Sequence, residues 1–419
     1  MSDRKRVVNN TIYQLVGKFV TMGVAFISTG LITRHFGVEN YGAFSLMLSF
    51  PALFFTISNF GLNTIATRDL ASGSKEIDRY IGSVWVFRLL FSLALMVLAF
   101  ASLFFLPYSN FLRLGITVGL LTILTTTLIS TFSIAYQVRL RYDLFALSNS
   151  LGSLLYLGLV FAALYLNFGI LFLVWGQVIG GILTCLLSYR HLRGLGIKPV
   201  FAFDKSLLAP LFISSLPLGL TYVFSQVNFK SDSILLSVLK LPASFGLSNV
   251  ETVGIYGLPY KVFEASLIIP TFYMNAFFPI MVKNNSESRE KLMTNFKKSF
   301  GLLLLLGLAA SVFGYFMSPI FVNLLGGSDF SKSIVISRIL LGANILFYIT
   351  QPLFYLIVTL NGQKALPYIY LSAGIINLIL NITFIPRYSY LASANITWIS
   401  ELFVILMLVF TARKLLKRA

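Results

Sequence analysis

Twelve long apolar stretches constrain the fold of this chain more than any other feature of its sequence. A helix that crosses the hydrocarbon core of a bilayer needs about 20 mostly apolar residues, and each stretch reaches that length. Segments of about ten residues with alternating polarity, which are typical of membrane β-barrels, are absent. We therefore expect an all-α integral membrane protein with about 12 transmembrane helices. The stretches cover approximately residues 7–33, 41–65, 80–106, 111–135, 144–166, 168–189, 207–239, 253–282, 299–325, 334–360, 365–385 and 391–411.

The composition agrees with this expectation and leaves no room for a soluble domain of ordinary size. Hydrophobic residues make up 57% of the chain and charged residues only 11%, whereas soluble domains carry roughly a quarter charged residues. The first apolar stretch follows the basic residues Arg4, Lys5 and Arg6. It is too long for a signal peptide and lacks a small-residue cleavage site, so we interpret it as an uncleaved first helix. The single cysteine, Cys185, excludes an internal disulfide.

The positive charge is distributed as expected for a membrane protein rather than for a nucleic-acid-binding protein. Of the 32 Lys and Arg residues, 22 lie at the two termini and in the loops on the same side as the termini. Cytoplasmic loops carry this excess, so both termini are predicted to be cytoplasmic. The basic side would also attract anionic membrane lipids, and we expect no nucleic-acid partner. The loops on the opposite side carry only Arg34, Arg113, Lys240, Lys332 and Arg387.

An internal repeat divides the chain into halves. Residues 37–46 read GVENYGAFSL and residues 249–258 read NVETVGIYGL, an offset of 212 residues. An even number of spans per half gives both halves the same orientation, as in transporters built from parallel repeats. We expect two six-helix lobes, 1–199 and 200–419, around a central cavity. The segment 190–206 between them is the expected hinge.

The repeated residues themselves favour a structural role. Glu39 and Glu251 occupy the predicted start of a helix, where a carboxylate complements the helix dipole. Gly42 and Gly254 allow the close helix approach that small residues give in membranes. The same 212-residue register pairs two lysines placed inside predicted spans, Lys18 and Lys230.

The charged residues inside the predicted spans are mostly cationic. A charge at the bilayer centre costs about 2.5–3.5 kcal/mol on the insertion scale, so such residues should face a partner or water. The first six spans contain no carboxylate, while Lys261 and Glu264, three residues apart, can meet on one helix face. The excess of positive charge predicts an anionic ligand or a hydrated basic cavity; snorkelling to the interface is the alternative, above all for Arg88 and Arg338. The set comprises Lys18, Arg88, Lys230, Lys261 and Arg338 with Asp232, Glu264 and Glu401.

No catalytic constellation is present in the sequence. His35 and His191 lie far apart without metal-ligand spacing, and the phosphate-binding pattern G-x-x-x-x-G-K-[ST] does not occur. We therefore predict a transporter rather than an enzyme, with no cofactor and no metal site.

Several segments resemble one family of membrane proteins. TRHFGVENYGAFSL (33–46), NFGLNTIATRDLA (59–71) and VGIYGLPYKVFEA (253–265) are similar to segments of bacterial polysaccharide exporters. These include the O-antigen repeat-unit flippases of the multidrug/oligosaccharidyl-lipid/polysaccharide superfamily. NLILNITFIP (377–386) and TWISEL (397–402) match the Asn-containing span eleven and the start of span twelve in that family. The turn between them carries Ser389 and Ala392 where the family usually has glycine.

The resemblance implies a function in surface-polysaccharide assembly. The cargo would be an oligosaccharide on undecaprenyl pyrophosphate, moved by alternating access from the cytoplasmic to the outer leaflet of the bacterial inner membrane. Other surface-polysaccharide assembly proteins would then be partners. The pyrophosphate would be held by Lys18, Arg88, Lys230 and Lys261, because ammonium and guanidinium groups bind phosphate oxygens. Membrane-depth carboxylates available for ion coupling or gating are Asp232, Glu264 and Glu401.

Three other functions stay open at this stage. A multidrug cation antiporter of the same superfamily would need carboxylates in its cavity, and the first six spans have none. A peptidoglycan-precursor flippase carries a similar anion but typically has fourteen spans. A membrane-embedded polysaccharide polymerase or ligase would need a long outward loop, and the outward loops here are short.

Overall fold

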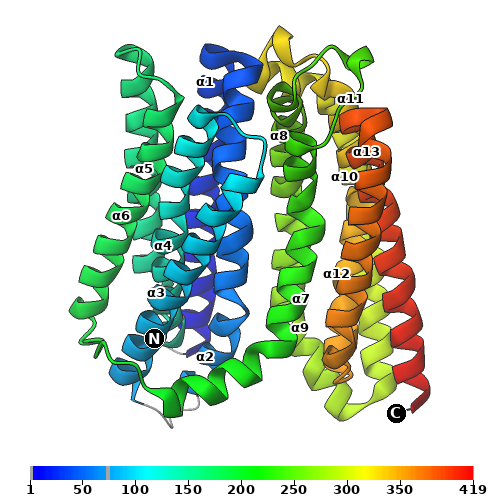
Figure 1. Cartoon of the computed structure of the whole chain (residues 1–419). Coiled ribbons are helices and arrows are strands. Elements are labelled where there is room, and N and C mark those ends of the chain that lie inside the picture. Colours follow the sequence, from blue (N-terminus) through cyan, green and yellow to red (C-terminus); the bar gives the residue numbers. More distant parts are fainter. Residues whose placement is uncertain (1–2, 72–75, 419) are drawn as a thin grey trace. The chain divides into compact units, whose positions relative to one another are not determined.

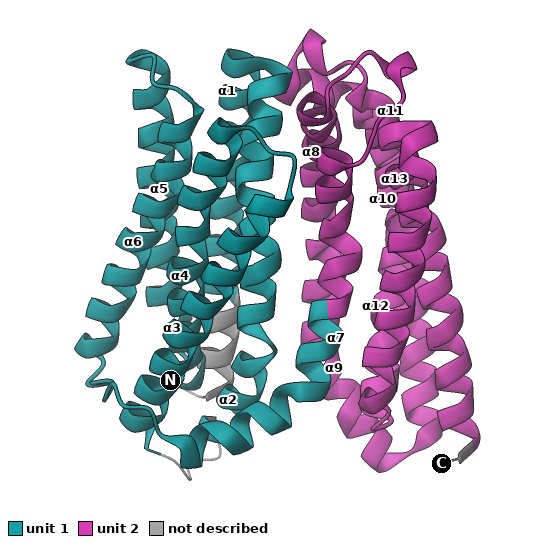
Figure 2. Cartoon of the chain, in the orientation of Figure 1, with its two compact units in different colours: residues 1–223 teal, residues 224–419 magenta. Residues whose placement is uncertain are grey.

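The computed structural model describes residues 3–71 and 76–418, and every regular element within them is a helix (Figure 1). The chain forms two compact units, Met1–Val223 and Phe224–Ala419 (Figure 2). Ten helical segments of the described residues are long and apolar enough to cross a membrane. The protein is therefore a multi-pass membrane protein, and the expected all-α fold is confirmed.

Two of the ten segments each contain two crossings. Helix α1 (Asp3–Asn59) is 57 residues long, or about 85 Å if straight, far more than a bilayer core of about 30 Å. Its backbone reverses at Gly37, where φ is 72°, and Figure 1 shows α1 turning back toward α2. Helix α13 (Leu366–Arg418) turns in the same way at Ser389, where φ is 49°. Counting both turns gives the twelve crossings expected from the apolar stretches.

The first unit contains the crossings of the amino-terminal half. After Asn59, the chain breaks at Phe60 and Gly61, which both have positive φ, and continues as a short helix along the second crossing. The remaining elements follow in order, and the unit ends inside α7. They are α2 (Leu62–Ala71), α3 (Ile77–Ser102), η1 (Leu103–Phe105), α4 (Asn110–Val138), α5 (Tyr142–Tyr165), α6 (Ile170–Gly194) and α7 (Lys205–Val238).

The second unit contains the rest of α7 and two crossings that are broken near their middle. One break lies at Leu267 between α8 and α9, and the other at Ala343 between α11 and α12. The breaks are joined, because Ser266 Oγ donates a hydrogen bond of 2.7 Å to the side chain of buried Asn344. The elements are η2 (Ala243–Phe245), α8 (Asn249–Ser266), α9 (Ile268–Glu287), α10 (Arg289–Gly326), η3 (Ser328–Phe330), α11 (Ser333–Gly342), α12 (Asn344–Thr359), η4 (Gln363–Ala365) and α13.

The internal repeat has a structural explanation. The turn at Gly37 in α1 corresponds, 212 residues later, to the start of α8 at Asn249. There Glu251 completes a capping box with Ser248: its Oε2 accepts from the Ser248 backbone at 2.7 Å, and its own backbone N–H donates to Ser248 Oγ at 3.2 Å. Such a box satisfies two helix-end donors, so Glu251 has the structural role expected from its position.

The segment between α6 and α7 belongs to the first unit. Val200 donates a backbone hydrogen bond of 3.0 Å to Asp78, and Arg79 forms an ion pair of 2.6 Å with Asp204. Hydrogen bonds from Ser206, together with the Arg79 guanidinium, hold the pKa of Asp204 below its usual range. A carbon added at Gly82 would lie 2.0 Å from the Val200 carbonyl oxygen, so the segment packs directly against α3.

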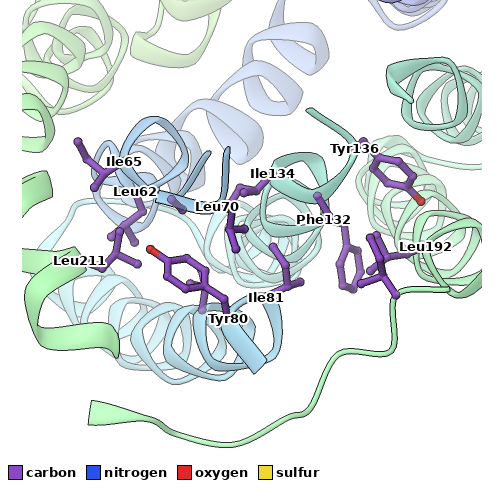
Figure 3. Packing of buried hydrophobic residues seen from close by; sticks show 14 of the residues in the cluster. Leu62, Ile65, Leu70, Tyr80, Ile81, Phe132, Ile134, Tyr136, Leu192 and Leu211 are labelled. Carbon is purple, nitrogen blue, oxygen red and sulfur yellow. The ribbon is translucent and has the colours of Figure 1, made fainter. Parts of the chain in front are cut away.

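The first compact unit continues past the segment between α6 and α7. Leu192 and Leu211, on either side of the segment, lie in one buried cluster with Leu62 and Tyr80 (Figure 3). The compact unit that contains this cluster extends to Val223, inside α7, and the lobe boundary at 199/200 stays a prediction. A hinge anywhere in 190–206 would have to separate residues that pack together within the first unit.

Small residues set the distance between α5 and α6. Gly176 and Gly180 on α6 are spaced four apart, the spacing that lets membrane helices approach closely. They face Tyr156 and Gly152 of α5: a carbon added at Gly152 would lie 1.9 Å from Thr184 Oγ1 and 2.6 Å from the Gly180 carbonyl oxygen. Neither contact leaves room for a side chain.

We expect Gly152→Leu to separate α5 from α6 and to destabilise the first unit by about 1–3 kcal/mol, the usual cost of overpacking. Gly158→Leu is the matched control, since Gly158 lies on the same helix with nothing within 4 Å of an added carbon. Thermal unfolding of the detergent-purified variants measures both. Equal midpoints for the two variants would contradict the proposed packing.

Candidate functional site

Three of the candidate residues form one charged cluster on α7 and α8. Lys230 of α7 donates to Glu264 Oε1 of α8, and its ammonium nitrogen lies 5.6 Å from the centre of the Tyr260 ring. The Tyr260 hydroxyl donates to the Phe229 carbonyl at 2.5 Å, which fixes the ring beside the lysine. Aromatic rings attract cations placed over their faces, so Tyr260 and Glu264 together hold the Lys230 ammonium group in place.

The cluster keeps an excess of positive charge. Lys261 lies close enough to Glu264 and Lys230 to interact electrostatically with both. The sequence paired Lys261 with Glu264 along one helix; in the structure Glu264 also forms an ion pair across two helices, with Lys230. Two cations share one carboxylate, and the Lys230 and Glu264 side chains remain 23% and 40% exposed. An approaching anion would meet a site with a net positive charge.

Asp232 belongs to a different, buried network in the same unit. Its carboxylate accepts hydrogen bonds from the Tyr256 hydroxyl at 2.6 Å and from the Asn381 amide at 3.1 Å. The amide of Asn381 also lies 3.0 Å from the side-chain oxygen of Asn377, and Ser393 donates to Asn381 at 2.8 Å. Within the described residues no cation pairs with Asp232. Neutral donors from α8 and α13 therefore hold this carboxylate.

Glu401 is buried between α12 and α13. The Thr350 hydroxyl donates to its Oε1, and the residue is 3% exposed. The contact joins two helices. Roles for Asp232, Glu264 and Glu401 in ion coupling stay predictions.

Arg88 lies in the interior of the first unit and is fully buried. Its guanidinium donates to Thr131 Oγ1 at 3.2 Å and to the side-chain and backbone oxygens of Asn59 at 3.1 and 3.3 Å. Asn59 is the last residue of α1, and cations are stabilised at helix carboxyl ends by the helix dipole and the unpaired carbonyls. This arrangement explains how an arginine can be buried with neutral hydrogen-bond partners.

The surroundings of Arg88 bear on its predicted role. The side chain does not reach solvent in this conformation, so it does not snorkel, and its NH1 and NH2 donors contact protein oxygens. Its Nε is buried without a hydrogen-bond partner. Anion binding by Arg88 stays a prediction, and it requires a rearrangement that exposes the guanidinium.

Lys18 lies in an open recess of the first unit. The recess has a volume of about 240 Å³ and lies between α1 and α5, where Gln14, Tyr142 and Asn149 share its lining with Lys18. Lys18 itself is exposed. Polar groups that could contact a ligand beside the ammonium group therefore come from both helices.

Two features of these clusters were missed by sequence reasoning. The ring of Tyr260 beside Lys230 and the hydroxyl of Tyr256 on Asp232 come from one face of α8, four residues apart. That spacing is visible in the sequence and could have marked them. Among the described residues no group of three or more His, Cys, Asp or Glu is placed to hold a metal ion, so no metal ligand is assigned.

Solved membrane transporters have folds similar to that of this chain. The structure is similar to the lipid II flippase MurJ in an inward closed conformation, with a TM-score of 0.77 and 16% identity over 96% of this chain and 87% of that one. It is similar to an inward-facing multidrug resistance MATE family transporter of the MOP superfamily, with a TM-score of 0.73 and 14% identity over 94% and 96% of the two chains. These similarities establish the fold.

A further similar structure is a MOP superfamily transporter from Pyrococcus furiosus, with a TM-score of 0.66 and 16% identity over 99% of this chain and 95% of that one. No curated protein sequence matches the chain. A family model described as polysaccharide biosynthesis protein matches residues 7–285, about two thirds of the sequence. The chain belongs to this family, as the resemblance predicted.

Proposed function

We propose that the protein is a flippase for an oligosaccharide linked to undecaprenyl pyrophosphate. It would move this lipid from the cytoplasmic to the outer leaflet of the bacterial inner membrane, with O-antigen or a similar surface-polysaccharide repeat unit as cargo. The family supports a role in polysaccharide biosynthesis. The similarity to a lipid II flippase supports a fold that accommodates a lipid-linked sugar.

The observation that carries this proposal is the net positive cluster of Lys230, Lys261 and Glu264. A pyrophosphate has enough charge to engage two ammonium groups, and hydrogen bonds between charged partners are roughly twice as strong as neutral ones. Lys18, its counterpart in the 212-residue register, would be a phosphate-binding residue of the first unit. Arg88 would bind the anion only after the rearrangement described above.

Transport would proceed by alternating access, with these cationic side chains lining the path of the pyrophosphate. Asp232, Glu264 and Glu401 are the carboxylates at membrane depth that could couple the cycle to an ion gradient. The excess of basic residues on the side of the termini supports a cytoplasmic location for both ends of the chain.

A multidrug antiporter is the second candidate, favoured by the similarity to MATE transporters. A drug antiporter exports cations, and a net positive cluster would repel them. A peptidoglycan-precursor flippase would suit the same cluster, and the MurJ similarity keeps it open, although such flippases typically have fourteen spans. A polymerase or ligase is the least supported alternative, because the outward loops are short.

A strain that lacks this protein should accumulate lipid-linked repeat units on the cytoplasmic face of the inner membrane, and the wild-type gene should clear them. Its resistance to cationic drugs should be unchanged. Accumulation of peptidoglycan precursors would favour the third candidate instead. Unchanged lipid-linked sugars together with drug sensitivity would overturn the proposal in favour of the antiporter.

A further inference from the structure

A second cavity lies in the second unit, apart from the charged cluster on α7 and α8. It is an open groove bordered by α10, α11 and α13 with a volume of about 660 Å³, within the range of small-molecule sites. Its walls include Val312, Phe316 and Val335, which are themselves 49%, 67% and 50% exposed. Since these helices span a membrane, exposed apolar walls of this kind face lipid.

One cation lies in this apolar setting. Arg338 of α11 is the single charged side chain among the residues that line the cavity. Its guanidinium carbon lies 5.1 Å from the centre of the Tyr315 ring, and its Nε is buried without a hydrogen-bond partner. Within residues 3–71 and 76–418 no carboxylate forms an ion pair with it. The cavity therefore has a positive charge that the protein does not neutralise locally.

Three other polar side chains of the lining donate hydrogen bonds to the backbone. Trp398 Nε1 donates to the Ile339 carbonyl at 2.8 Å, and Asn395 donates to the Leu391 carbonyl at 2.8 Å. Ser311 donates to the Gly342 carbonyl at 2.9 Å and accepts from the Ile345 backbone at 2.9 Å. Arg338 is thus the charged group of this lining that remains to select a ligand.

The depth of Arg338 corresponds to the headgroup region. It lies five residues after Ser333, the start of its membrane crossing, or about 8 Å along the helix. Tyr315 and Trp398 line the same cavity, and these two residue types concentrate at membrane interfaces. Lys332, the residue before Ser333, donates a hydrogen bond to the Phe245 carbonyl. Phe245 lies in a loop on the side of the membrane opposite the predicted basic, terminal side. Arg338 therefore lies near the outer leaflet if the termini are cytoplasmic.

We propose that this cavity binds one anionic phospholipid. The phosphodiester accepts hydrogen bonds from the Arg338 guanidinium, and an acyl chain lies along Val312, Phe316 and Val335. A single guanidinium matches the single charge of a phosphodiester and binds its oxygens in a bidentate manner. A pyrophosphate, by contrast, suits the two lysines of the other cluster. This lipid site is separate from the proposed transport path and does not depend on the identity of the cargo.

Native mass spectrometry of the purified full-length protein tests the proposal with phosphatidylglycerol and phosphatidylethanolamine as probes. The wild type should retain one phosphatidylglycerol with a preference of about tenfold, because the ammonium group of phosphatidylethanolamine offsets the charge of its phosphodiester and weakens the contact with the Arg338 guanidinium. Arg338→Gln should lose this preference and Arg338→Lys should retain part of it. Arg113→Gln is the matched control, because it removes another arginine on the same side of the membrane.

Fluorescence locates the bound lipid. Phosphatidylglycerol with brominated acyl chains should quench the emission of Trp398, and Trp398→Phe should abolish that part of the quenching. Equal retention of both lipids by the wild type would overturn the proposal, and this comparison does not depend on whether Arg338→Gln folds. Displacement of phosphatidylglycerol by undecaprenyl pyrophosphate at equal concentration would also overturn it, because the cavity would then be a cargo site.

Discussion

Lys230→Gln is expected to reduce transport of the lipid-linked oligosaccharide by roughly ten- to a hundredfold, while the amount of folded protein in the membrane stays unchanged. The variant removes a charged donor to phosphate, and hydrogen bonds to charged groups contribute about 1.5–3 kcal/mol. Each 1.4 kcal/mol corresponds to about a factor of ten. The rate at which lipid-linked repeat units reach the outer leaflet of a complemented deletion strain measures the effect.

A second variant separates anion binding from a purely structural ion pair. The double variant Lys230→Gln with Glu264→Gln removes both members of the ion pair and leaves Lys261 as the cation of the cluster. If Lys230 binds the cargo, the double variant stays as inactive as the single one. Recovery of transport in the double variant would show that the pair is structural. Lys240→Gln serves as the control, since Lys240 is an exposed lysine that follows the end of α7, and it should transport normally.

Arg88→Leu is expected to destabilise the first unit by about 3 kcal/mol or more, because it leaves the buried oxygens of Asn59 and Thr131 without their donor. The detergent-purified variant should unfold at a clearly lower temperature than the wild type. Arg139→Gln is the control: Arg139 is exposed at the end of α4, and surface changes usually stay within about 0.5 kcal/mol.

The opposite outcome for Arg88 has a definite meaning. A variant that keeps wild-type stability but loses transport would assign Arg88 to the cargo rather than to the fold. It would also require a conformation in which the guanidinium leaves Asn59 and becomes accessible. The sequence placed Arg88 with the anion-binding residues because no local acid accompanies it. The competing explanation is that Arg88 is a structural residue whose guanidinium is satisfied by neutral hydrogen-bond partners.

The fold was largely predictable, because membrane crossings depend on apolar length. The twelve stretches and the turn at Gly37 follow from composition and from the repeat. The breaks at Leu267 and Ala343 do not, since their stability depends on Ser266 and Asn344 meeting across 78 residues of chain. The packing of Leu192 and Leu211 into one cluster of the first unit could not be predicted either, because it is a tertiary effect.

The charged residues were found from the sequence more readily than their partners. A charge inside an apolar stretch is visible by itself, which identified Lys230, Glu264 and Arg88. Their contacts join residues 34 positions apart for Lys230 and Glu264, and 29 apart for Arg88 and Asn59. Local spacing suggested Lys261 as the partner of Glu264, and only the structure brings Lys230 of the other helix to the same carboxylate.

The central claim, that the protein flips a lipid by recognising its pyrophosphate, is tested most directly with purified protein in liposomes. A fluorescent oligosaccharide on undecaprenyl pyrophosphate should cross to the opposite leaflet much faster with wild-type protein than in protein-free liposomes. The same oligosaccharide on an uncharged lipid should not, and Lys230→Gln should approach the protein-free rate. Equal rates for the charged and uncharged lipids, or full activity of Lys230→Gln, would contradict the claim.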